Sequence, residues 1–198
     1  MARTKMKTKG FDLDNGSSFG IVAILDVLGV SSYSLESTKS FLRSRNVLIE
    51  QLQPLSEKFS EFEEDLCPPE ISTFENTLIF TWVVGKDRVM KGLVPVAEWL
   101  STAVNLGIYH KMLLRGAISV GEYVIEKNTV IGQAVAAAWY EDADWFGVTL
   151  TSSIEFHLIS LIESEYGKDT GGFEKWFVEY DVPRKGSMKK KQRCVVAI

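Results

Sequence analysis

An apolar run near the start of the chain ends in a carboxylate. Residues 21–25 are all apolar, which is typical of a buried β-strand, and Asp26 follows them directly. A carboxylate at the edge of a core is costly unless a cation or hydrogen-bond donors pair with it. The Gly29–Ser32 segment predicts an open turn, and residues 34–36 indicate a helix start. Such a turn directs backbone N–H groups at an anion, so carboxylate, metal and phosphate could meet here; the plain alternative is an exposed aspartate before an ordinary loop.

Apolar side chains at spacings of three and four predict four helices downstream. Pro54 either kinks or divides the first of them. Gly132 opens the alanine-rich third helix, and Thr151 is a good N-cap for the fourth. The expected helical ranges are residues 34–66, 89–109, 133–142 and 151–163.

Short apolar runs between these helices predict strands. Two of them flank Glu75-Asn76 and indicate a hairpin with a polar tip, and two more turn near residues 126–128. The expected strands after the first are residues 71–74, 77–84, 113–123, 129–131, 146–150 and 176–182.

The resulting order of elements favours an α+β fold: a mixed, mainly antiparallel sheet with helices packed on one face. In this layout the end of the first strand and the hairpin tip lie side by side. Asp26 and Asn76 would then face one site from neighbouring central strands, the arrangement that two-metal phosphoryl chemistry requires.

Length and composition indicate one globular domain. The chain has 198 residues, of which 45% are hydrophobic, and two domains of half this size would have thin cores. We expect a domain over residues 18–182, with basic flexible tails at residues 1–17 and 183–198. No apolar stretch is long enough for a membrane span or a secretory signal, so a cytoplasmic location is expected.

The charges are distributed unevenly. The two tails hold ten of the 22 Lys and Arg residues, whereas residues 11–182 hold 12 of them with all 26 Asp and Glu residues, a net charge of −14. A folded body this acidic argues against a nucleic-acid-binding surface. Cys67 and Cys194 have neither the number nor the spacing of a disulfide framework or zinc site.

Four segments, in this order and spacing, resemble the class III nucleotide cyclases, in particular the compact bacterial branch that includes pyrimidine cyclases of antiphage defence. The resemblance covers about residues 20–165. The third segment is fairly specific to the compact branch, whereas the first alone would be weak. The segments are residues 24–31 (ILDVLGVS), 74–80 (FENTLIF), 114–122 (LRGAISVGE) and 130–138 (VIGQAVAAA).

The resemblance implies a ferredoxin-like core and a site with two divalent ions, Mn²⁺ or Mg²⁺. In the family two Asp side chains, and the backbone carbonyl after the first, hold these ions, which activate the ribose 3′-hydroxyl and bind the triphosphate. Asp26 and Val27 match the first pair, but Asn76 stands where the second Asp is expected. An amide supplies a carbonyl oxygen without negative charge, so it would hold the ion less tightly.

Three explanations of this departure remain open. The protein binds nucleotide without turnover; or Glu75 substitutes after a local bulge; or the asparagine was introduced to freeze an active enzyme.

The resemblance also suggests which residues bind substrate. Arg115 is the best-placed cation to neutralise the phosphates, although a strand-end arginine could equally pair with Glu122 or another acid. Glu122 could read a base amino group or face solvent. The backbone donors expected to cradle the phosphates are those of Leu28, Gly29, Val30 and Ser31.

The third predicted helix departs from many cyclases as well. Ala136 and Tyr140 align where those enzymes carry an Asn and an Arg that bind ribose and transition-state phosphate. The compact branch often lacks that pair. Trp139 and Tyr140 could stack on a base, or they could belong to the core.

The resemblance therefore implies a lyase that converts a nucleoside triphosphate, UTP or else CTP, to its 3′,5′-cyclic monophosphate and pyrophosphate. It further implies a head-to-tail homodimer and a second messenger read by a separate receptor in antiviral signalling. A protein with Asn76 in place of the second Asp could instead be a catalytically silent module that binds nucleotide or a partner.

Overall fold

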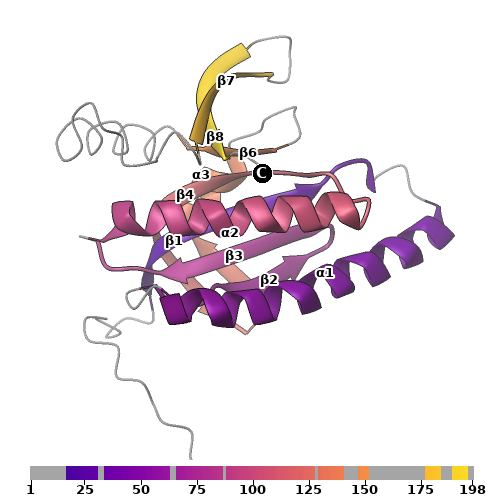
Figure 1. The fold of residues 1–198 in the computed structure, drawn as a ribbon, viewed down its shortest axis with the longest axis horizontal. Helices are drawn as coiled ribbons and strands as arrows, with labels where there is room; N and C mark the ends of the chain where they lie inside the picture. Colours follow the sequence, from indigo (N-terminus) through magenta and orange to yellow (C-terminus); the bar gives the residue numbers. More distant parts are fainter. Residues whose placement is uncertain are drawn as a thin grey trace, which may run out of the picture.

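An eight-stranded mixed sheet forms the centre of the molecule (Figure 1). The computed structural model describes residues 17–30, 34–62, 66–86, 88–127, 129–140, 147–151, 177–183 and 189–195. The strands are β1 (Ser18–Val27), β2 (Glu70–Phe74), β3 (Thr77–Val83), β4 (Leu114–Glu126), β5 (Thr129–Gly132), β6 (Gly147–Leu150), β7 (Phe177–Pro183) and β8 (Lys189–Val195). The helices are α1 (Leu35–Phe62), α2 (Val89–Tyr109) and α3 (Gln133–Tyr140).

The strands follow the order β2-β3-β1-β4-β6-β8-β7, and β5 pairs with β4 beside this path. Only the β4–β6 pair is parallel; the other pairs are antiparallel. The expectation of a mixed, mainly antiparallel α+β fold is confirmed. Because β1 lies between β3 and β4, the end of β1 is flanked by a strand on each side.

The helices cover both faces of the sheet, not one as the sequence suggested (Figure 1). Ile21, Ala23 and Leu25 of β1 join the cluster that includes α2, whereas Val22 and Ile24 join a second cluster with α3. Successive side chains of a strand point to opposite faces, so the part of a strand that is covered on both sides is apolar at successive positions. This double burial explains the unbroken apolar run of β1.

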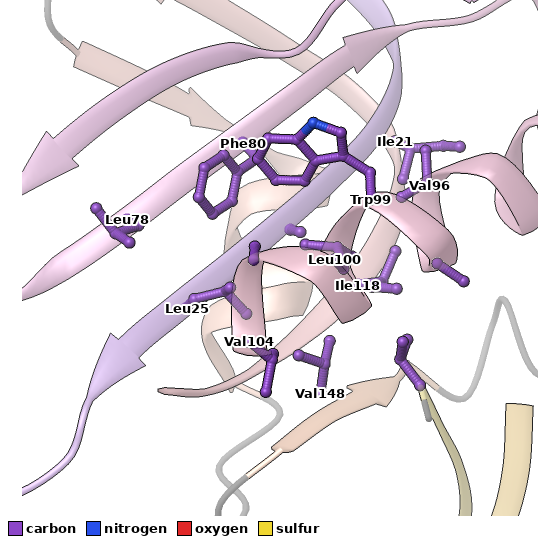
Figure 2. Close-up of a cluster of buried hydrophobic side chains, with 14 of the residues drawn as sticks. Ile21, Leu25, Leu78, Phe80, Val96, Trp99, Leu100, Val104, Ile118 and Val148 are labelled. Atoms are coloured by element: carbon purple, nitrogen blue, oxygen red, sulfur yellow. The ribbon is translucent and has the colours of Figure 1, made fainter. Parts of the chain in front are cut away.

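Aromatic rings pack among aliphatic side chains in the larger cluster, which includes α2 (Figure 2). The ring centroids of Phe80 and Trp99 lie 4.8 Å apart, and those of Trp82 and Trp99 lie 5.5 Å apart, both in edge-to-face geometry. All three rings are buried. Edge-to-face pairs add attraction beyond the area they bury, which fixes α2 against β3.

The longer predicted elements match the structure closely. Residues 89–109 form α2 as expected, and residues 35–62 form one continuous helix that contains Pro54 and is not divided by it. Strand β4 continues to Glu126, beyond the expected end at residue 123, because it pairs with β5 through that residue. No helix among the described residues has the length and apolarity to cross a membrane.

The C-terminal segment differs from its prediction as a flexible tail. Residues 189–195 form β8, which pairs with β7 along its length and meets β6 at Thr149. Gln192 and Cys194 are buried, while Lys191, directly before them, is exposed and forms an ion pair with Glu179 at 3.2 Å. Alternate residues thus reach the core within a stretch whose composition is basic, which is why composition alone was misleading.

Some predictions lie outside the described residues. They concern the N-terminal tail through residue 16, Ser31, residues 141–146, the expected helix over residues 151–163 beyond Thr151, and Trp176.

Candidate functional site

The carboxylate of Asp26 lies between two neighbouring strands. Asp26 pairs with Thr77 on β3 and with Arg115 on β4 in the antiparallel register. Directly opposed residues of a sheet project from the same face, so these three side chains share a face. That face is the one on which α3 packs, because Val22 and Ile24 of the same strand contact α3's cluster.

A two-residue turn places Asn76 beside Asp26. Phe74 pairs with Thr77, so Glu75 and Asn76 form the tip of the β2–β3 hairpin. Glu75 adopts a positive φ of 52°, which is uncommon for a residue other than glycine. The backbone N–H of Val27 donates to the carbonyl of Asn76 at 3.2 Å, which joins the turn to the end of β1.

The side-chain amide of Asn76 makes two contacts with the end of β1. Its Nδ2 donates a short hydrogen bond to Asp26 Oδ1 and a second bond, at 3.2 Å, to the backbone carbonyl of Val27. The structure therefore brings together the three residues that the sequence grouped as a metal site. In this arrangement the nitrogen end of the amide faces the two oxygens.

Arg115 contacts the other carboxylate oxygen. Its Nη2 lies 3.4 Å from Asp26 Oδ2, and the two side chains are 25% and 31% exposed, respectively. The pairing of Arg115 with an acid other than Glu122 is thereby confirmed. Since both Asp26 oxygens accept hydrogen bonds, its charge is shared between an amide and a guanidinium group.

Glu122 is not part of this cluster within one chain. It lies seven residues along β4 from Arg115, a separation of about 23 Å at roughly 3.3 Å per residue. Glu122 is exposed there and pairs with Lys86 at 3.5 Å. The structure therefore does not bring Glu122 together with Asp26 and Arg115 in one chain.

The predicted phosphate cradle is only partly available. The N–H of Leu28 donates to the carbonyl of Leu113 at 2.9 Å, so it is not directed at a ligand, contrary to the prediction. Gly29 follows with a φ of 82°, while Ser31 lies outside the described residues. A role of Gly29, Val30 and Ser31 in phosphate binding stays a prediction.

The start of α1 agrees with its prediction. Ser34 Oγ accepts a hydrogen bond from the N–H of Ser37 at 3.2 Å, as an N-cap does. This cap fixes where the helix begins after the loop that leaves β1.

The aromatic residues at the end of α3 are not core residues. Trp139 is 53% exposed and Tyr140 is 82% exposed, whereas Ala134 and Ala138 are buried against the sheet. The core alternative for Trp139 and Tyr140 is therefore wrong. Ala136 is exposed as well, so this helix presents little polar chemistry.

Arg45 of α1 was not identified from the sequence. Its Nη1 donates to the carbonyl of Glu75 at 2.6 Å, which ties the helix to the hairpin tip. Nothing in the amphipathic pattern of residues 34–66 distinguishes Arg45 from the other polar residues of the helix.

Glu75 does not take the place of the second Asp. The pairing of β3 with β1 and β2 leaves no bulge before Asn76, and Glu75 is exposed, so its substitution for the second Asp is not supported.

The donors at this site fit a hard divalent cation in kind. A carboxylate, a backbone carbonyl and a side-chain amide carbonyl are the oxygen ligands that Mg²⁺ and Mn²⁺ prefer. The Asn76 oxygen can take part only if the amide is turned, because Nδ2 now faces the other two oxygens. The three oxygen ligands together carry one negative charge, that of Asp26, which Arg115 partly balances. The described residues hold no cluster of three or more Asp, Glu, His or Cys side chains suited to a metal.

Comparison with known proteins identifies the fold. No protein-family model and no curated protein sequence matches the chain. The catalytic core of a rhodopsin-guanylyl cyclase with converted specificity, solved with ATPαS, superposes with a TM-score of 0.56 and 12% identity, over 92% of this chain and 97% of that one.

Two further structures agree with this result. The dimeric guanylyl cyclase domain from the aquatic fungus Blastocladiella emersonii gives a TM-score of 0.52 at 12% identity, over 90% of this chain and 94% of that one. The guanylyl cyclase Cya2 gives 0.50 at 14% identity, over 91% and 92%. The chain thus has the fold of guanylyl cyclase catalytic domains.

Proposed function

We propose that this protein is a nucleotide cyclase, which converts a nucleoside triphosphate to its 3′,5′-cyclic monophosphate and pyrophosphate. The observation that carries the proposal is the convergence of Asp26, the Val27 carbonyl and Asn76 at the end of a central strand, with Arg115 against the same carboxylate. The likeness of the whole fold to cyclase catalytic domains supports it. The sequence motifs at these positions favour the same activity.

The residues of the site have distinct proposed roles. Asp26, the Val27 carbonyl and the Asn76 amide oxygen would hold Mn²⁺ or Mg²⁺, up to two ions. When bound, such ions lower the pKa of the ribose 3′-hydroxyl and neutralise the triphosphate. Arg115 would share the negative charge that develops on the phosphates, and Gly29 and Val30 would offer backbone donors.

The finer parts of the proposal rest on the sequence resemblance. Its compact bacterial branch favours a pyrimidine substrate, UTP before CTP, and a second messenger of antiviral defence that acts on a separate receptor. A head-to-tail homodimer follows from the same resemblance, because the site of that family is completed across two chains. Among the structural neighbours, one guanylyl cyclase domain is described as a non-canonical dimer and another, a double mutant, as monomeric.

The activity is tested by incubating the protein with Mn²⁺ and each of ATP, GTP, CTP and UTP in turn, with detection of 3′,5′-cyclic product by mass spectrometry. We expect one cyclic pyrimidine nucleotide, lost in Asp26→Asn. A cyclic purine product would overturn the substrate assignment alone. Lys91→Gln, which changes an exposed residue of α2 outside the site, is the matched control for losses during purification and assay.

A second function is favoured by a specific observation, the bond from Asn76 Nδ2 to Asp26. When an amide and a guanidinium group already satisfy the Asp26 carboxylate, the protein can have the fold of a cyclase and still not catalyse cyclisation. In that case no product forms from any nucleotide, while equilibrium dialysis still detects saturable nucleotide binding. Appearance of product only in Asn76→Asp would establish this silent module.

A further inference from the structure

The amide of Asn76 does for the end of β1 what a cation would do. One NH₂ group donates to the carboxylate of Asp26 and to the carbonyl of Val27, two oxygens from different residues. Buried or half-buried oxygens that face one another need a positive partner between them. In this structure that partner belongs to the protein itself.

The backbone of the hairpin tip is fixed on both sides of this amide. The Asn76 carbonyl accepts from the Val27 N–H, and the Glu75 carbonyl accepts from Arg45. Thr77, the next residue, is 4% exposed and is paired with Asp26 in the sheet. The tip cannot move away from β1 without breaking these bonds, so the mobile part of Asn76 is its side chain.

An asparagine amide has two different ends on one rotatable bond. Rotation about the Cβ–Cγ bond by about 180° exchanges the NH₂ group for the carbonyl oxygen and leaves the rest of the residue in place. The torsion is of the sp³–sp² type, which has broad minima and low barriers. The same position can therefore present either a donor or a metal ligand.

We propose that the Asn76 amide is a two-position rotor that stands in for a divalent cation and gives way to one. Without the cation, Nδ2 faces Asp26 and Val27. With the cation bound, the amide turns and Oδ1 becomes the third oxygen ligand. This inference rests on the cation site of the proposed function and explains what an asparagine gains there over an aspartate.

With an asparagine at position 76, the hairpin tip can pack against β1 without a bound metal ion. An aspartate at position 76 would place a second carboxylate against Asp26 and the Val27 carbonyl. Arg115 already forms an ion pair with Asp26. Like charges at hydrogen-bonding distance are unfavourable unless a cation separates them. The asparagine removes this repulsion at the expense of cation affinity, which depends on the number of charged ligands.

The first test observes the amide directly. The side-chain NH₂ resonances of Asn76 are assigned in a ¹⁵N–¹H spectrum of the full chain by their loss in Asn76→Asp, and Mg²⁺ is then titrated because it is diamagnetic. We expect these two resonances to move together with the backbone resonance of Val27, as the hydrogen bonds to Asp26 and Val27 are given up. The side-chain resonances of Asn46, exposed on α1, should stay in place.

The second test compares thermal midpoints in EDTA and in rising Mg²⁺. In EDTA, Asn76→Asp should unfold several degrees below the wild type, and it should recover at an Mg²⁺ concentration at least about tenfold below that which shifts the wild type. Asn46→Asp is the matched control, since it makes the same chemical change on an exposed helix face. It should show neither the loss in EDTA nor the recovery.

The outcomes separate this inference from the function on which it rests. If Mg²⁺ shifts Val27 but leaves the Asn76 NH₂ resonances unmoved, the rotor is overturned while the cation site stands. If only Asn76→Asp responds to Mg²⁺, the amide excludes the cation and the rotor is again overturned. If neither protein responds, the cation site of the proposed function fails, and the rotor fails with it.

Discussion

At the scale of single residues, the site is a carboxylate surrounded by donors. Asp26 accepts from Asn76 on one oxygen and from Arg115 on the other, and both Asp26 and Arg115 are about one-third exposed or less. Hydrogen bonds to an ionised group are stronger than those between neutral groups. The carboxylate is therefore held in one orientation.

We predict that Arg115→Met affects activity far more than stability. A partly exposed ion pair contributes about 0.5 kcal/mol to the free energy of unfolding, because solvent screens it. A cation that neutralises charge developing on a phosphate contributes about 10²-fold to the rate. Denaturant titration and the cyclase assay measure the two quantities. Arg115→Lys, which keeps the charge, should restore part of the rate; equal losses in both variants would contradict the role.

A second residue-scale prediction concerns Tyr123. Burial raises the pKa of its phenol from 10.0 to about 12, and the hydroxyl of Thr81 opposes the shift. The unfolded chain then ionises at lower pH than the native protein, so the contribution of Tyr123 is complete below pH 10 and is lost between about pH 10 and 12.

The loss is measured by unfolding the protein with urea over that pH range. A shift of this size corresponds to at most roughly 3 kcal/mol. Tyr123→Phe should remove most of the decline between pH 10 and 12, whereas Tyr140→Phe, at an exposed position, should retain it. A decline of the same depth in Tyr123→Phe would show that other groups cause it.

At the scale of elements, the tip of the β2–β3 hairpin is positioned by a helix that is distant in sequence. Arg45 of α1 binds the carbonyl of Glu75, in the turn where Glu75 adopts a positive φ. A left-handed residue other than glycine is unfavourable by itself and persists when its surroundings hold it. The helix thus fixes the turn that presents Asn76.

We predict that Arg45→Met lowers the free energy of unfolding by about 1–2 kcal/mol, the usual contribution of a hydrogen bond to a charged donor. The variant should also shift the backbone resonances of Asn76 and Val27, because the turn loses its anchor. Arg43→Met, two residues earlier and exposed on the same helix, is the matched control and should leave both unchanged. Unchanged resonances in Arg45→Met would mean that the sheet alone fixes the turn.

Sequence patterns located most of the elements but few of the contacts between them. The apolar runs located α2 and the β2–β3 hairpin, because period and turn chemistry are local properties. The partner of Arg115 could not be chosen from the sequence, since only the register of β4 against β1 places Asp26 opposite Arg115. Arg45 carried no signal, because a contact between a helix and a turn thirty residues away depends on packing.

At the scale of the whole molecule, the sheet extends into residues whose composition is basic. Strand β8 lies between β6 and β7, and the Nε2 of Gln192 donates to the carbonyl of Leu150 at 3.2 Å. Without β8, the edge of β6 would lose this pairing. The C-terminal segment is therefore a structural part of the sheet.

We predict that removal of residues 189–198 lowers the free energy of unfolding by at least about 2 kcal/mol, since it leaves an unpaired strand edge and buried polar groups without partners. Urea unfolding of the truncated and full chains measures the difference. Lys191→Ala removes one exposed ion pair and keeps the strand, so it should cost no more than about 0.5 kcal/mol. A truncated chain as stable as the full one would restore the view of this segment as a tail.

Strand β1 supplies side chains to both core clusters on alternate residues and carries Asp26 at its end. A strand shared in this way links the two sides of the molecule into one cooperative unit. Unfolding of either cluster would also remove the β1 side chains from the other cluster, and Asp26 would lose its position at the same time. The slowest-exchanging amides of the protein should accordingly be those of β1, and the ligand-binding geometry should persist, unaltered, up to the denaturant concentration at which the whole core is lost.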